Sequence, residues 1–207
     1  MLVPLMRLLF RVKVEGIEHL PKSGPAILAF NHVSFLDGPC LAITTAWKRR
    51  RATRFLVAIE IYDLKFSGTL MRLFQQIPIR RGKGDTDALG EAIQTIRAGA
   101  LSAIAPEGHI NPHPDDGLQR IRTGVSRIAL PTGAAVVPVG IWGTQVRYPK
   151  EGIRWDPPWR PKLALVYGEV IVPHGDPASR SDANAFREQV RVALEEQVER
   201  ARAITGT

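Results

Sequence analysis

Short apolar runs and longer amphipathic segments follow one another along most of this 207-residue chain. The short runs, bounded by glycine and proline, predict strands at residues 12–15, 26–30, 55–61, 101–105, 134–141 and 163–172. Apolar residues at helical spacing predict helices at residues 39–47, 64–75, 85–98, 121–130 and 181–204. This alternation indicates an α/β fold, so we expect one domain over residues 1–207. It would be a sandwich with a largely parallel or mixed central sheet and helices on both faces.

A few residues mark where these elements begin, end or break. Asp85 is a predicted cap for the helix that runs to Ala98, and Ser181 or Asp182 for the closing helix at 181–204. Gly168 breaks the 163–172 segment into one or two strands. Pro138 stands inside a predicted strand, which normally indicates a sheet edge.

Residues 1–11 form an apolar N-terminal segment interrupted by Arg7. Arg11 and Lys13 follow where a signal peptide would place its small cleavage-site residues, so we do not expect a signal peptide. No stretch reaches the roughly 18 uninterrupted apolar residues that cross a bilayer. The segment is either a core helix or an apolar foot in the membrane interface.

The chain is basic, with 28 basic against 20 acidic residues and a formal charge of +8. Its 21 arginines against 7 lysines favour bidentate recognition of phosphate. Anionic lipid, coenzyme A and nucleic acid all fit that charge. The basic run at 48–54 is a solvated loop or a patch for an anionic membrane. It lacks interleaved aromatic residues and no nucleic-acid fold signature accompanies it, so we expect no nucleic acid partner.

A single cysteine, Cys40, excludes an internal disulfide and suits a reducing compartment. We interpret it as a small buried hydrophobe rather than a nucleophile. His109 and His113 have a spacing that ligates metals on a helix, but Pro112 and Pro114 predict a loop, so we expect no metal site.

The strongest chemical signal is the pair His32 and Asp37, five positions apart between the strand at 26–30 and the helix that follows. Within one helix these side chains would lie about 140° apart, whereas a turn lets the carboxylate reach the imidazole. Aspartate would fix the histidine tautomer and leave the other ring nitrogen free to accept a proton. The alternative is that Asp37 or Ser34 caps the helix and His32 is an ordinary hydrogen-bonded residue.

The stretch Val14 to Gly38 closely resembles the first signature block of the glycerolipid acyltransferase family, which includes 1-acylglycerol-3-phosphate acyltransferase. Residues 76–84 resemble the second block. That resemblance places Arg81, with Arg80 beside it, where the family holds the phosphate of the acceptor. A surface turn with solvated charges is the alternative.

Pro106, Glu107 and Gly108 resemble the centre of the third block, which implies that Glu107 and Gly108 help form the acceptor pocket. Glu107 would otherwise cap a helix or bridge an arginine. Ile110 stands where the family has a phosphate-binding arginine. Residues 117–124 resemble a further motif with Arg122 in the position of its lysine, so Arg120 and Arg122 would supply the missing charge. Residues 134–141 resemble the fourth block, with Pro138 at the wall of the site.

The resemblance implies an O-acyltransferase of phospholipid biosynthesis, peripheral on the cytoplasmic side of the cell membrane. It would move a fatty acyl group from an acyl-CoA or acyl carrier protein thioester to a lysophosphatidate-like acceptor, without a further cofactor. His32 would act as the base, and backbone N–H groups near its turn as oxyanion donors. Two alternatives stay open: a different lipid acceptor, such as a lysophospholipid or glycolipid, and a non-catalytic basic protein on the membrane surface.

Overall fold

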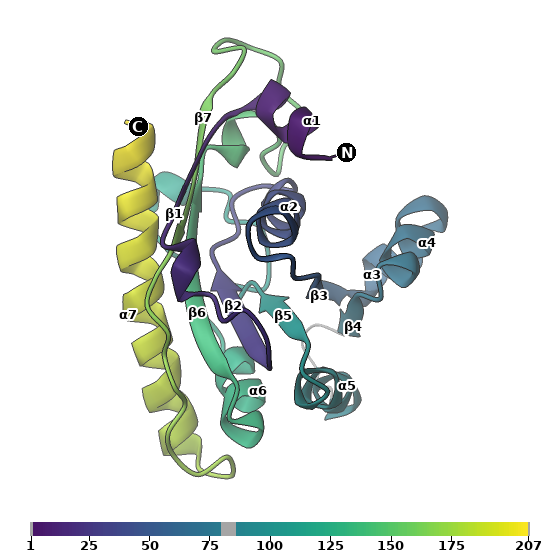
Figure 1. Ribbon diagram of the computed structural model, residues 1–207, viewed down its shortest axis with the longest axis vertical. Coiled ribbons are helices and arrows are strands. Elements are labelled where there is room, and N and C mark those ends of the chain that lie inside the picture. The colour runs from purple at the N-terminus through teal and green to yellow at the C-terminus, as the bar shows by residue number, and fades with distance from the viewer. Residues whose placement is uncertain (1, 80–85, 207) are drawn as a thin grey trace.

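The computed structural model describes residues 2–79 and 86–206, and a seven-stranded sheet forms its centre (Figure 1). The strands are β1 (Arg11–Glu15), β2 (Ala26–Phe30), β3 (Thr53–Ala58), β4 (Ile77–Ile79), β5 (Leu101–Ile104), β6 (Ala135–Trp142) and β7 (Lys162–Tyr167). Their order is β1-β7-β6-β2-β5-β3-β4. The strands from β6 to β4 are parallel, while β7 is antiparallel to β6 and parallel to β1. The prediction of a largely parallel or mixed sheet is confirmed.

Helices cover both faces of the sheet, as predicted. The helices are α1 (Leu2–Leu9), α2 (Asp37–Arg49), α3 (Ile59–Tyr62), α4 (Lys65–Leu73), α5 (Thr86–Arg97), α6 (Gly124–Thr132) and α7 (Arg180–Thr205). Met6 and Leu41 bring α1 and α2 into the core on one face. Ile96, Ile128 and Phe186 bring α5, α6 and α7 into the core on the other. The short helices α3 and α4 extend from the β3–β4 edge (Figure 1). None of the described helices has the length and hydropathy of a membrane span.

Two local predictions were wrong. The strand predicted at 55–61 ends at Ala58, and Ile59–Tyr62 forms one helical turn instead. A short apolar run has no periodicity that distinguishes these two states. The closing helix is capped by Ser179, whose hydroxyl accepts from the N–H of Asp182 at 3.2 Å. The Asp182 carboxylate instead accepts from the N–H of Asp176 at 2.7 Å. Asp85 lies outside the described residues.

Pro138 lies in β6, a central strand, so the sheet-edge position that a proline normally indicates was the wrong prediction here. The Val136 N–H and the Pro138 carbonyl point toward β7, where they bond to Ile171 at 2.9 Å and to Gly168 at 2.8 Å. The Pro138 nitrogen therefore faces the gap between the end of β7 and Ile171. β7 ends at Tyr167, so the proline stands where the ladder between β6 and β7 is already interrupted.

Helix α7 packs directly onto β6 at Gly140. A Cβ at Gly140 would stand 2.1 Å from the carbonyl oxygen of Gln197 and 2.5 Å from the nitrogen of Val198. Both neighbours are helix backbone, which cannot move aside as a side chain would. In contrast, a Cβ at Gly90 of α5 would meet nothing within 4 Å.

We therefore expect Gly140→Ala to lower the free energy of unfolding by about 2–3 kcal/mol, because the helix must shift off the sheet. The matched change Gly90→Ala should raise it by up to about 1 kcal/mol, because alanine is the better helix former. Urea denaturation followed by circular dichroism measures both. Equal effects of the two changes would mean that α7 does not approach β6 this closely.

Candidate active site

The site begins where β2 leaves the sheet. All five residues of β2 are buried, and the next residue, Asn31, ties the chain to β6. Its side-chain amide donates to the carbonyl of Ile141 at 2.9 Å, and its side-chain oxygen accepts from the Ile141 N–H at 2.7 Å. His32 is therefore held at the carboxyl end of the parallel strands, where ligands of α/β proteins commonly bind.

The carboxylate of Asp37 organises the turn that follows. One oxygen accepts from Nδ1 of His32 at 2.9 Å and from the N–H groups of Val33 and Ser34 at 2.7 and 2.8 Å. The other oxygen accepts from the hydroxyl of Thr144, in the loop after β6. The side chain is 0% exposed. With both oxygens engaged, the carboxylate has one orientation, and so does the imidazole that donates to it.

The imidazole of His32 is the exposed half of this pair. Because a carboxylate only accepts, Nδ1 carries the hydrogen and Nε2 is left with a lone pair. Phe30 packs against the ring edge-on, with centroids 5.9 Å apart. The side chain is 23% exposed and lines a large groove. Asp37 makes no capping bond to α2, so the helix-cap alternative does not describe its contacts.

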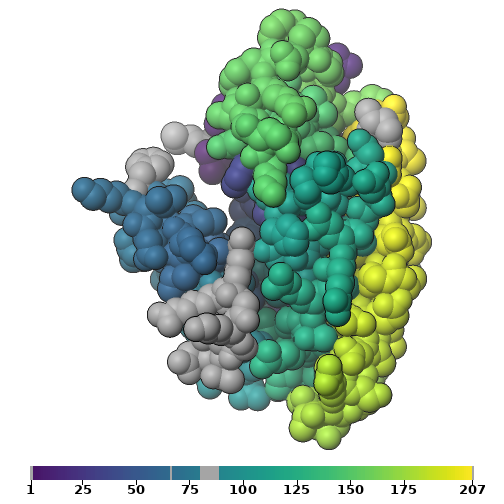
Figure 2. Space-filling view, turned by 180° about the vertical axis from the view of Figure 1, so that it is seen from behind, coloured from purple at the N-terminus to yellow at the C-terminus, as the bar shows by residue number. Residues whose placement is uncertain are grey.

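The groove beside His32 has a volume of about 1390 Å³ and a mostly apolar wall. Figure 2 shows the molecule hollowed between the segment coloured blue, which contains α3 and α4, and the teal segment at the centre of the view. Apolar side chains from α1, α2, β3 and α4 line it, among them Leu2, Ile43, Trp47, Phe55, Leu70 and Phe74. A groove of this kind suits a long hydrocarbon chain.

The comparisons with known proteins agree with this geometry. Residues 11–142 match the family described as Acyltransferase. This chain belongs to the acyltransferase family. It is 34% identical over 149 residues to an uncharacterized protein of Mycobacterium leprae, covering 68% of this chain and 38% of that protein.

Two further proteins that are similar to this chain are named as 1-acylglycerol phosphate acyltransferases. The 1-acyl-sn-glycerol-3-phosphate acyltransferase LPAT1 of Arabidopsis thaliana is 28% identical over 92% of this chain and 50% of its own length. The crystal structure of the 1-acyl-sn-glycerophosphate (LPA) acyltransferase PlsC of Thermotoga maritima is similar with a TM-score of 0.72. It is 28% identical, and the match covers 95% of this chain and 74% of that one. The chain thus spans about half the length of the plant relative.

The backbone N–H groups of residues 32–37 all have acceptors within the protein, so none of these six is free to serve as the predicted oxyanion donor. The His32 N–H donates to Glu107 at 2.7 Å, and those of Val33 and Ser34 donate to Asp37. The Phe35 N–H donates to the Tyr148 carbonyl. The Leu36 N–H donates to the Ser34 hydroxyl, and the Asp37 N–H to the Ser34 carbonyl.

Glu107 is buried and holds two loops together. Its second oxygen accepts from the Gln119 N–H at 3.1 Å. Burial raises the pKa of the Glu107 carboxyl above its ordinary value, against the opposing effect of the two N–H donors. Glu107 therefore neither caps a helix nor bridges an arginine. It fixes His32 and the loop that leads to Arg122.

The predicted phosphate-binding arginines are placed in part. Arg122 lines the groove with His32, and its Nε would lie 3.3 Å from a Cβ on Gly108. Arg120 is exposed in a neighbouring groove. Ile110, which replaces an arginine of the family motif, is buried. Arg80 and Arg81 lie outside the described residues.

Two minor expectations concern a thiol and a metal. Burial, with the charge of Asp37 adding to it, raises the pKa of the Cys40 thiol to about 12. A protonated thiol is a poor nucleophile, which agrees with its interpretation as a core residue. His109 and His113 are exposed, and no three His, Cys, Asp or Glu side chains in residues 2–79 and 86–206 gather as metal ligands do.

Sequence reasoning missed Thr144, which is separated from Asp37 by 107 positions. Its one local signal is that Gly143-Thr144 directly follows β6, at the same sheet edge as His32. Nothing in the sequence pairs it with Asp37. The bonds of Asn31 to β6 were also not predicted, although Asn31 lies in the stretch that resembles the first family block.

We expect Thr144→Val to lower the free energy of unfolding by about 1–3 kcal/mol, because a buried carboxylate oxygen loses its donor while the shape is kept. The control is Thr69→Val, whose exposed hydroxyl bonds only to the Lys65 carbonyl of its own helix. It should change stability by less than about 0.5 kcal/mol. Urea denaturation compares the two, and an equally small loss in both would show that Asp37 does not depend on Thr144.

Proposed function

We propose that this chain is a single acyltransferase domain that moves a fatty acyl group from an acyl thioester to the hydroxyl of a lysophosphatidate-like acceptor in phospholipid synthesis. The observation that carries the proposal is the His32–Asp37 pair at the edge of a long apolar groove. The groove suits the acyl chain, and the pair suits activation of a hydroxyl. The named relatives act on 1-acylglycerol phosphates, which supports the choice of acceptor.

The reaction follows from the position of Nε2. This nitrogen takes the proton of the acceptor hydroxyl while the oxygen attacks the thioester carbonyl. The tetrahedral intermediate then expels the thiolate as the C–S bond breaks, and the thiolate takes the proton back from His32. No covalent enzyme intermediate is required, because a thioester is already activated and the groove holds both reactants together.

Arg122 is the proposed anchor for the acceptor phosphate, together with Arg120 and, as the family resemblance implies, Arg81 and Arg80. Arg122 lines the same groove as His32, and we also assign it as a cation for the developing oxyanion. Ile110 removes one arginine of the family pattern, so phosphate binding rests on the others.

We expect His32→Ala to lower the rate of acyl transfer by at least about 100-fold, the typical loss of a general base. The fold should survive, since the imidazole is partly exposed and packs at the rim of the core. The control is His174→Ala, an exposed histidine in the loop before α7, which should retain full activity. A labelled acyl thioester and a panel of lysolipids, with and without a phosphate monoester, measure transfer.

Two results would contradict parts of this function. Near-normal turnover by a folded His32→Ala protein would show that His32 is not the general base. A wild-type preference for an acceptor without a phosphate monoester would remove the lysophosphatidate assignment but leave acyl transfer intact.

The proposal includes a peripheral position on the cytoplasmic side of the cell membrane. Helix α1 buries Met6 but exposes Leu2, Leu5 and Leu8 by 57%, 51% and 67%. Beside it, a cleft of about 630 Å³ is lined by the cations Arg7, Arg11, Lys13, Arg160 and Lys162. Exposed leucines next to clustered cations suit an anionic bilayer.

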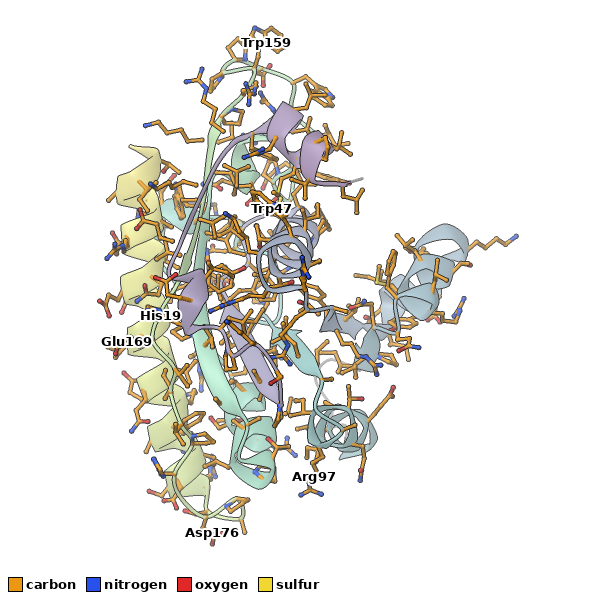
Figure 3. The ribbon with its side chains drawn as sticks, in the orientation of Figure 1. His19, Trp47, Arg97, Trp159, Glu169 and Asp176 are labelled. Carbon is orange, nitrogen blue, oxygen red and sulfur yellow. The ribbon has the colours of Figure 1, made fainter. Side chains whose placement is uncertain are left out.

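The loop between β6 and β7 adds aromatic residues to this end of the molecule. Trp155 and Trp159 are 61% and 70% exposed, and Arg160 donates to the Arg7 carbonyl at 2.7 Å. Trp159 lies beyond α1 at one end of the molecule (Figure 3). Tryptophan is enriched at membrane interfaces, so we assign this loop to the same surface.

The basic run at 48–54 contributes less to that surface than expected. Arg51 is buried and donates to the carbonyls of Pro21 and Gly24 at 3.0 and 2.5 Å. It also donates to the Gly99 carbonyl at 3.4 Å, so its guanidinium joins its own loop to two others and is not available to lipid. Lys48 and Arg50 stay exposed, and Lys48 stacks on Trp47 with its ammonium 4.3 Å from the ring centre.

We expect the wild-type protein to sediment with anionic vesicles and to be released by salt. The double change Leu5→Asp with Leu8→Asp should weaken this binding by about tenfold or more, because each exposed leucine would otherwise bury apolar area in lipid. Val192→Asp, at a valine of α7 that is 54% exposed, is the control and should bind as wild type does. Equal binding of all three proteins would mean that α1 does not contact lipid.

A further inference from the structure

A second groove, about 940 Å³ in volume, lies between the segment 119–127 and the first turns of α7. Five arginines line it: Arg120, Arg122, Arg127, Arg180 and Arg187. Glu107 is the one carboxylate among its described lining residues, and both Glu107 oxygens already accept backbone N–H groups. The groove is therefore strongly cationic and has no free acid to balance it.

The arginines of this groove differ from those elsewhere on α7. Arg191 pairs with Glu188 and Glu195 at 2.8 and 2.7 Å, and Arg200 pairs with Glu15 at 2.9 Å. Within residues 2–79 and 86–206, none of the five groove arginines takes part in an ion pair. One helix thus pairs its arginines where they face solvent and leaves them unpaired where they face a cavity. Such a set of guanidinium groups suits phosphate oxygens.

The extent of the groove limits what can fill it. Arg180 and Arg187 are seven residues apart on one helix, which separates them by about 10 Å along its axis. Arg122, Thr123 and Arg127 line both this groove and the apolar groove of His32, so the two cavities meet there. A ligand that fills both carries several anionic groups at one end and a hydrocarbon chain at the other.

We propose that this groove, referred to below as the arginine groove, binds the phosphate groups of coenzyme A through Arg127, Arg180 and Arg187 when acyl-CoA is the thioester donor, which leaves Arg120 and Arg122 to the acceptor phosphate. The proposal rests on the proposed acyl transfer. Coenzyme A carries a diphosphate and a separate 3′-phosphate, and its pantetheine arm reaches from these phosphates to the thioester. The acyl chain then lies in the apolar groove, the thioester beside His32, and the nucleotide between α6 and α7.

Two other anions fit the groove less well. A lysophosphatidate has one phosphate close to its reacting hydroxyl, so that phosphate must stay near His32 and cannot reach both arginines of α7. An anionic membrane fits the groove less well, because the proposed membrane surface lies elsewhere. Asp176, just before α7, lies at the opposite end of the molecule from Trp159 and α1 (Figure 3). A concave groove of this volume also suits a small ligand better than an acidic protein surface.

The test compares a double variant, Arg180→Gln with Arg187→Gln, against a matched double control on the same helix, Arg191→Gln with Arg200→Gln. Initial rates are measured with acyl-CoA and with the acyl-pantetheine thioester of the same chain, which lacks the nucleotide. Binding of adenosine 3′,5′-bisphosphate is measured separately by calorimetry. This second readout needs no catalysis, so failure of the proposed activity and failure of the arginine groove are distinguishable.

We expect the groove variant to raise KM for acyl-CoA by about 10- to 100-fold, with kcat within about twofold, since each lost charge-assisted contact typically accounts for about tenfold. KM for acyl-pantetheine and for the acceptor should not change. The groove variant should also bind adenosine 3′,5′-bisphosphate more weakly. The control variant should match wild type in every measurement.

Three results would overturn the proposal. One is an unchanged KM for acyl-CoA together with unchanged bisphosphate binding. Another is a rise in KM for the phosphorylated acceptor in place of the donor, which would assign the groove to lysophosphatidate. The third is a loss of anionic-vesicle binding with donor KM intact, which would assign the arginines to the membrane.

Discussion

The buried carboxylate of Asp37 is the contact on which the arrangement of the site depends. It receives the His32 imidazole and two backbone N–H groups of its own turn, and the Thr144 hydroxyl from the loop after β6. A carboxylate that is 0% exposed is tolerated only when its oxygens accept hydrogen bonds. The four donors are therefore fixed in position together with the carboxylate. The orientation of His32 is a consequence of this packing and does not need to be created when substrate arrives.

The sheet brings these groups to one edge. β2 lies between β5 and β6, and the three strands are parallel, so their carboxyl ends coincide. His32 follows β2, Glu107 follows β5 and Thr144 follows β6. Glu107 binds the His32 N–H, and Asp37 binds Thr144. The strands on either side of β2 thus fix the turn of His32 and Asp37, one through the acceptor Glu107 and the other through the donor Thr144.

Around this rigid turn the surface divides by chemistry. The groove from His32 toward α1 and α4 is mostly apolar, and the arginine groove between α6 and α7 is cationic. The two meet at Arg122, Thr123 and Arg127. Separation of this kind matches an amphipathic substrate, because an apolar wall cannot solvate phosphate and a row of arginines gains nothing from a hydrocarbon chain. It also keeps the proposed membrane surface at α1 apart from the arginines of α7.

The sequence by itself determined what depends on neighbours along the chain. The run at 26–30, the turn after it and the five-residue spacing of His32 and Asp37 identified a strand, a turn and an imidazole–carboxylate pair, because these follow from local periodicity and chain reversal. What only the tertiary structure decided depends on which strands lie side by side. Thr144 reaches Asp37, Pro138 occupies a central strand, and Arg51 is buried among three loops. No local pattern encodes sheet order, and each of these contacts joins residues that only that order brings together.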